Sequence, residues 1–122
     1  MNKIKDAYYF QHDSNARHDP KIKALIKKYG VEGYGRYFIL LENLREASNY
    51  KLKDKEYTWE ALAEDFRCES KEVKKFVDDC IEIFELLDRG DGWVYSLSLV
   101  QRMIKLDAIR EKRRQAGIAR WE

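Results

Sequence analysis

Two histidine–aspartate pairs near the N-terminus are the residues whose types could support metal binding or hydrolysis. His12 is followed by Asp13, and His18 is followed by Asp19. Asp19 also precedes Pro20, and this dipeptide is typical of a helix start, where the carboxylate accepts backbone hydrogen bonds. No further set of histidines and carboxylates recurs at the spacing of metal ligands. We expect a structural role for both pairs. We predict no metal site, cofactor or catalytic residue, and therefore no enzyme.

A second group of candidate residues lies in the helix that we predict from Ser70 onward. We expect its outward residues to include Ser70, Lys71, Lys74 and Lys75 near the start, and Asp78, Asp79 and Glu82 toward the end. Recognition helices usually enter the DNA major groove with their N-terminal end, so lysines there could contact phosphates. A solvated helix face of mixed charge would show the same pattern. Because no arginine or asparagine is placed for bidentate base reading, the pattern favours phosphate binding of low sequence specificity.

Two further candidates for DNA contact are a loop arginine and a basic cluster near the end of the chain. Arg89 lies in a predicted hairpin loop, where it could reach a flanking phosphate or the minor groove. A solvated Arg89 is equally compatible, because Asp88 and Asp91 lower the local positive potential. The basic cluster consists of Arg110, Lys112, Arg113 and Arg114. It could follow a DNA backbone, contact a partner protein or link to a second domain.

The candidate residues are positioned by a predicted helix–turn–helix and hairpin. Apolar residues at helical spacing predict one helix over Trp59–Phe66 and a longer one that follows the turn Arg67–Glu69. The stripe of the longer helix is Val73, Phe76, Val77, Cys80, Ile81 and Phe84. The loop Asp88–Gly92 contains two glycines that permit φ > 0, and Trp93–Tyr95 suits a β-strand. This order is that of a winged helix-turn-helix, so we predict a mainly α fold with a small β-hairpin.

The predicted N-terminal elements precede this motif. We expect a helix from Pro20 to Tyr29, ended by Gly30, and a longer one from about Glu32 to about Ala47. The aromatic stretch Ala7–Gln11 is β-prone and could pair with the wing. The polar loop 49–57 could hold one short strand around Leu52. Thr58 and Ser70 are expected to cap the two helices of the motif.

The predicted C-terminal helix begins at about Ser98. Its candidate packing residues are Leu99, Val100, Met103, Leu106 and Ile109. Beyond Ile109 the apolar stripe fades, and Ile118 and Trp121 have no clear partner within the domain. We therefore assign residues 1–100 to a winged-helix domain and residues 101–122 to a basic helical extension or a linker to a missing domain.

Composition limits the classes of function that fit this chain. Its 122 residues and 44% hydrophobic content suit one domain with a modest core. The net charge is only +2, so nucleic-acid binding would have to rely on local patches. The sequence has no membrane-spanning run and no signal-peptide core, so we expect a cytoplasmic protein without a membrane partner. Cys68 and Cys80 are expected to be reduced thiols, with Cys80 in the core.

Several segments of the sequence together match a known family. They are the N-terminal aromatic strand, the segment Asp13–Ile22, the glycine- and tyrosine-rich segment Tyr29–Tyr37, the leucine-rich helix with Leu40, Leu41 and Glu42, the LAEDF and ESKEV pieces, and the basic ending with Ala116, Ala119, Arg120 and Trp121. In these features the chain resembles the N-terminal domain of phage replisome organisers, which is related to DnaD-type primosome proteins. The resemblance implies a winged-helix domain that organises replication proteins at a phage or mobile-element origin. It also implies DNA, a helicase loader or primosome components, and a second copy of the chain as partners.

Three functions are compatible with these patterns. The first is a DNA-binding module of replication initiation. Its DNA contacts would be Ser70, Lys71, Lys74, Lys75, Arg89 and the basic cluster. The second is a protein-interaction or oligomerisation module of the primosome with little direct DNA binding, which the low net charge favours. The third is a transcriptional regulator, which shares the fold but would need base-reading side chains.

Overall fold

The computed structural model describes residues 18–121, and the side chains of residues 18–118. Helix α2 (Pro20–Glu46) has its N-cap at Asp19, which accepts a hydrogen bond from the Lys21 amide at 2.8 Å. The predicted cap is therefore confirmed. Gly30 has φ 73° and ψ −169°, which kinks α2 at the residue where the sequence predicted the end of one helix. The expected strand Ala7–Gln11 lies outside the described residues.

Helices α3 (Glu56–Phe66) and α4 (Ser70–Glu82) form the predicted helix–turn–helix. Arg67 ends α3 in the left-handed conformation at φ 56°, and this turns the chain back toward α4. The two helices bury the predicted stripes, with Trp59, Leu62, Phe66, Val73, Phe76, Val77 and Cys80 in the core. Cys68 and Cys80 do not form a disulfide, and Cys68 is half-buried in the turn. Burial raises the pKa of the Cys80 thiol to about 12.

Two predicted helix caps are wrong. Helix α3 begins at Glu56, so Thr58 lies inside its first turn, and its N-cap Lys55 makes no side-chain hydrogen bond. Ser70 is the first residue of α4 rather than its cap, and its hydroxyl lies 3.5 Å from Glu56 Oε1. Tertiary packing of the apolar faces fixes both starts, because packing contributes more to short helices than a single cap does.

The wing is part of a small antiparallel sheet. Strands β2 (Asp88–Gly90) and β3 (Trp93–Tyr95) form the predicted hairpin, whose turn residues Asp91 and Gly92 have φ 54° and 82°. Both turn residues therefore adopt positive φ, as a two-residue type I′ turn requires, whereas Gly90 is an ordinary strand residue. Strand β1 (Lys51–Lys53) follows the short helix η2 (Ser48–Tyr50) and pairs with β3, which gives the order β1-β3-β2.

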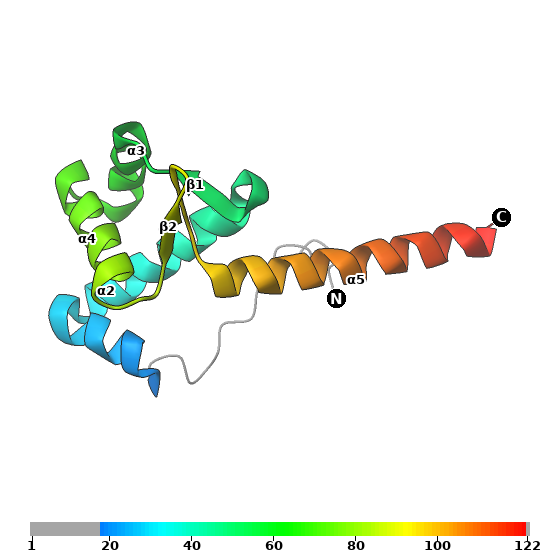
Figure 1. Ribbon diagram of the computed structural model, residues 1–122, viewed down its shortest axis with the longest axis horizontal. Coiled ribbons are helices and arrows are strands. Elements are labelled where there is room, and N and C mark those ends of the chain that lie inside the picture. The colour runs from blue at the N-terminus through cyan, green and yellow to red at the C-terminus, as the bar shows by residue number, and fades with distance from the viewer. Residues whose placement is uncertain (1–17, 122) are drawn as a thin grey trace.

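Helix α5 (Leu97–Trp121) packs by its first turns and then projects far beyond the rest of the molecule (Figure 1). Leu99 and Met103 are buried, as predicted, and Leu106 packs against the core. Ile109 is 37% exposed, so it is wrongly predicted as a packing residue. The helix runs without a break across residue 100. The predicted fold class, mainly α with a winged helix-turn-helix and a C-terminal helix, is confirmed.

Candidate nucleic-acid interface

The lysines predicted to contact DNA lie on α4 and face solvent. The side chains of Lys71, Lys74 and Lys75 are 83%, 48% and 66% exposed. Each has a carboxylate partner: Lys71 Nζ lies 3.3 Å from Glu69, and Lys74 Nζ lies 3.2 Å from Asp78, one helical turn away. Such exposed pairs contribute only about 0–1 kcal/mol, so a phosphate could replace these carboxylates.

Asp79 was predicted to face outward, and this prediction is wrong. Asp79 is only 9% exposed, and its carboxylate accepts a short hydrogen bond from the Tyr29 hydroxyl of α2. Lys28 Nζ lies 3.1 Å and Lys75 Nζ 3.7 Å from the same oxygen. Burial alone would raise the pKa of Asp79, but the hydrogen bonds from Tyr29 and Lys28 outweigh it and lower the pKa. The carboxylate therefore ties the first half of α2 to α4, and Lys75 is part of this tie.

Arg89 lies on β2, one residue before the turn, rather than at the tip of the wing. Its guanidinium binds two carboxylates, with Nη2 at 2.5 Å from Asp78 and Nε at 2.9 Å from Asp54. The hydrogen bond to Asp78 raises the pKa of Arg89 further. Arg89 and Lys74 thus share Asp78, so the fold brings these two predicted contacts together. Neither sequence interpretation of Arg89, as a DNA contact or as a solvated side chain, anticipated this internal clamp.

The predicted basic cluster lies on α5, apart from α4 in the described structure (Figure 1). Arg110 lies 3.2 Å from Asp107, and Arg114 binds Glu111 through two nitrogens, at 3.1 and 2.6 Å. Within residues 18–118, Lys112 and Arg113 take part in no ion pair. The positive charge available from the predicted cluster is therefore smaller than the sequence indicates, and within the cluster it belongs mostly to these two residues.

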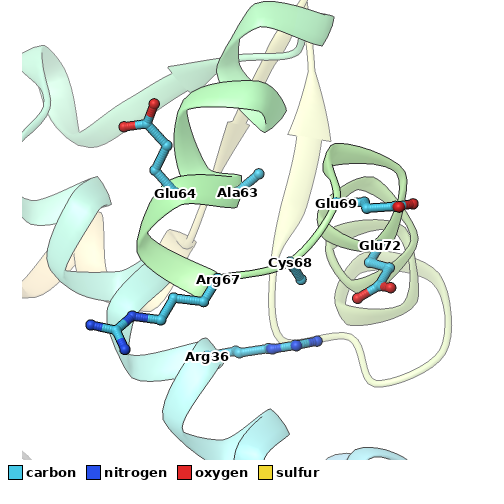
Figure 2. A pocket seen from close by; sticks show the side chains of 7 residues that line it. All are labelled: Arg36, Ala63, Glu64, Arg67, Cys68, Glu69 and Glu72. Carbon is cyan, nitrogen blue, oxygen red and sulfur yellow. The ribbon is translucent and has the colours of Figure 1, made fainter.

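A shallow groove of about 550 Å³ lies beside the helix–helix turn, next to the start of α4 (Figure 2). Its charged lining consists of Glu64, Glu69, Glu72, Arg36 and Arg67. Figure 2 shows Glu69, the N-cap residue of α4, and Glu72 of α4 beside the groove, whereas Arg67 points away from α4. Arg36 Nη2 is already bound to Glu32 at 2.7 Å. The groove is thus partly acidic, and a phosphate would meet less repulsion from the lysine-bearing side of α4.

Sequence reasoning missed two lysines of β1, Lys51 and Lys53. No ion pair found among residues 18–118 includes either of them. Their alternate spacing matches that of Trp93 and Tyr95 on β3. This period of two could have identified them from the sequence, because alternate residues of paired strands lie on one face of a sheet.

Only part of the two histidine–aspartate pairs lies within the described residues. His18 is exposed, whereas His12 and Asp13 lie outside the described residues. Within residues 18–121, no three histidine, cysteine or carboxylate residues cluster as metal ligands would. None of the helices there has the length and apolar content needed to cross a bilayer.

Comparison with known proteins gives one result. No curated protein and no solved structure matches this chain significantly. Residues 9–99 match the family model described as Lin1244/Lin1753-like, N-terminal. The match includes α2, the helix–turn–helix and the wing, and it ends at the start of α5. Because it covers well over half of the sequence, the chain belongs to the Lin1244/Lin1753-like, N-terminal family.

Proposed function

We propose that this chain is a DNA-binding winged-helix module of a phage or mobile-element replication initiation protein. The observation that carries the proposal is the surface of α4, where Lys71, Lys74 and Lys75 are solvent-exposed beside Arg89. Recognition helices present their N-terminal halves to the major groove in this fold. The resemblance to phage replisome organisers supplies the replication context, and a module of this kind would act in the cytoplasm.

In this proposal α4 makes phosphate contacts rather than base-specific ones. Ser70, Lys71, Lys74 and Lys75 would contact the groove edges, and a phosphate would compete with Asp78 for Lys74 and Arg89. Lys112 and Arg113 on α5 would add contacts to the backbone outside the winged-helix footprint, with Arg110 and Arg114 contributing less. Because phosphate contacts release counterions, affinity should fall steeply with salt.

The test is fluorescence anisotropy of a labelled duplex of about 20 bp at several salt concentrations. The variant Lys74→Gln/Lys75→Gln should weaken binding and reduce the log–log salt slope by at most about two, since each phosphate contact contributes about 0.9 and both lysines must first leave their carboxylates. The matched control is Lys23→Gln/Lys27→Gln, which removes the same charge from exposed positions of α2. Equal effects of both variants would remove α4 from the interface, and no binding at low salt would refute DNA binding.

A protein-interaction module of the primosome is the second candidate. It is favoured by the internal pairing of the α4 and wing cations and by the three glutamates in the groove beside α4. The partners would then be a helicase loader, another primosome component or a second copy of the chain. In that case the duplex would bind weakly or not at all, and Glu69→Gln/Glu72→Gln would weaken the protein complex instead.

A further inference from the structure

The outward face of the sheet presents two aromatic, two basic and one acidic side chain, and the acidic one is Asp88, which lies opposite Tyr95. Directly opposite residues of an antiparallel pair share a face, and the register places Lys51 opposite Tyr95 and Lys53 opposite Trp93. Val94, between the two aromatic residues, points the other way and is fully buried. Because alternate strand residues share a face, Lys51, Lys53, Trp93 and Tyr95 all lie on the side away from the core. We call these four residues the sheet-face cluster.

The two aromatic rings of the cluster are partly accessible. Trp93 and Tyr95 are half-buried, and Lys51 Nζ lies 4.3 Å from the centre of the Trp93 ring. Gly90 on β2 contributes no side chain beside them, and the Tyr95 hydroxyl lies 3.7 Å from the point where a Cβ of residue 90 would be. A Cβ at this position would be in ordinary van der Waals contact with the Tyr95 hydroxyl. The cluster therefore offers two partly accessible π-systems, and the Lys51 ammonium lies over the Trp93 ring.

The lysines of the cluster are available for an anion. Nearby carboxylates have other partners: Asp54 binds Arg89 at 2.9 Å, and Asp88 lies 3.3 Å from the Leu97 amide at the start of α5. Among the described residues, the one contact found for the Lys51 ammonium is a cation–π contact with Trp93, and such contacts contribute about 0.5–2 kcal/mol. Lys51 can therefore exchange the Trp93 ring for a phosphate and leave the ring to another planar group.

We propose that the sheet-face cluster binds single-stranded nucleic acid, with unpaired bases stacked on Trp93 and Tyr95 and phosphates held by Lys51 and Lys53. Aromatic side chains beside cations are the means by which proteins bind single strands without reading sequence. Alternate strand residues are about 7 Å apart, roughly twice the 3.4 Å rise of a stacked strand. Only an unstacked strand can reach both rings, because the bases of a duplex keep their faces covered.

This inference extends the proposed function from duplex to unpaired DNA, and it uses a surface distinct from α4. An origin-binding module with both surfaces would contact a duplex through α4 and an opened strand through the sheet. The two contacts can fail independently, since they share no residue.

The test is anisotropy of a labelled oligo-dT of about 12 nucleotides, run beside the duplex titration. Trp93→Leu keeps an apolar side chain but removes the stacking surface, and it should weaken single-strand binding roughly tenfold or more. The matched control Tyr57→Leu changes a tyrosine of α3 that is 57% exposed, and it should leave binding unchanged. Duplex binding should be unaffected by Trp93→Leu.

A second variant keeps the test decisive if Trp93→Leu fails to fold. Lys51→Gln/Lys53→Gln changes two lysines without ion-pair partners among residues 18–118, and it should weaken oligo-dT binding and flatten its salt slope. Absence of oligo-dT binding, or binding insensitive to this variant, would overturn the sheet-face proposal. Oligo-dT binding without duplex binding would support it and instead refute the α4 interface.

Discussion

The α4 surface and the sheet-face cluster both carry lysines, but the lysines differ in what surrounds them. On α4, Lys74 and Lys75 each have a carboxylate within 4 Å one turn along the helix. On the sheet, Lys51 faces an aromatic ring, and Lys53 has no ion-pair partner among the described residues. The number of basic residues on a surface therefore does not measure the positive charge that is available to a ligand. A cation that already has an anion must exchange it before it can bind a phosphate.

The largest effect that we expect is a loss of stability on removal of Asp79, the buried carboxylate of α4. Asp79→Ala would leave the Tyr29 hydroxyl without its acceptor and should lower the free energy of unfolding by about 2–3 kcal/mol. Urea denaturation measures this directly. Glu82→Ala, an exposed carboxylate at the end of the same helix, is the matched control and should change stability by less than about 0.5 kcal/mol. Equal losses would show that Asp79 does not tie α2 to α4.

The same carboxylate gives the stability a pH dependence. Because the pKa of Asp79 is lower in the folded state than its ordinary value of 3.8, its contribution is present above that value. It should be lost as the pH falls through the folded-state pKa, when the carboxylate takes up a proton. Denaturation between pH 6 and pH 2 should therefore show a steeper acid loss for the natural protein than for Asp79→Asn. Parallel curves would contradict the lowered pKa.

A smaller effect is expected from releasing the cations that Asp78 holds. Asp78→Asn removes the shared carboxylate from Lys74 and Arg89, while Asp54 still holds Arg89 in place. We expect duplex affinity to rise severalfold and the salt slope to steepen by about one. Asp65→Asn makes the same charge change on the exposed face of α3 and is the control. An unchanged slope would place this part of the surface outside the DNA interface.

Much of the fold could be predicted from periodic patterns, because these depend on local spacing. The apolar stripes of α3 and α4, the break at Gly30 and the wing hairpin were all visible in this way. The partner of the wing was not, since the pairing of Lys51–Lys53 with β3 joins residues about forty positions apart. The burial of Asp79 was missed for the same reason, because its partner Tyr29 lies fifty residues earlier.

The sequence predicted where the basic residues of the candidate site lie, but not which of them are paired with carboxylates. The i,i+4 spacing of Lys74 with Asp78 and of Lys75 with Asp79 is itself a sequence signal for ion pairing, and it could have lowered the expected charge of α4. The Arg89 clamp carries no such signal, because Asp54 belongs to a different element. Sequence therefore located the cations, and tertiary structure decided which of them are available.

The smallest effect that we expect distinguishes a paired from an unpaired cation. It concerns two neighbouring arginines of α5. Arg113 has no ion-pair partner within the described residues, whereas Arg114 binds Glu111 through two nitrogens. Arg113→Gln and Arg114→Gln remove the same charge, so any long-range attraction of DNA should fall equally. The number of phosphate contacts should not, since Arg114 must first break its pair.

We therefore expect Arg113→Gln to reduce the log–log salt slope of duplex binding by about one, and Arg114→Gln to change it much less. Anisotropy titrations at four or more salt concentrations resolve such a difference. Equal slopes for the two variants would mean that net charge alone governs binding, and paired and unpaired cations would then be equivalent toward DNA. If neither variant changed the slope, α5 would not touch the duplex, and the phosphate contacts would lie on α4.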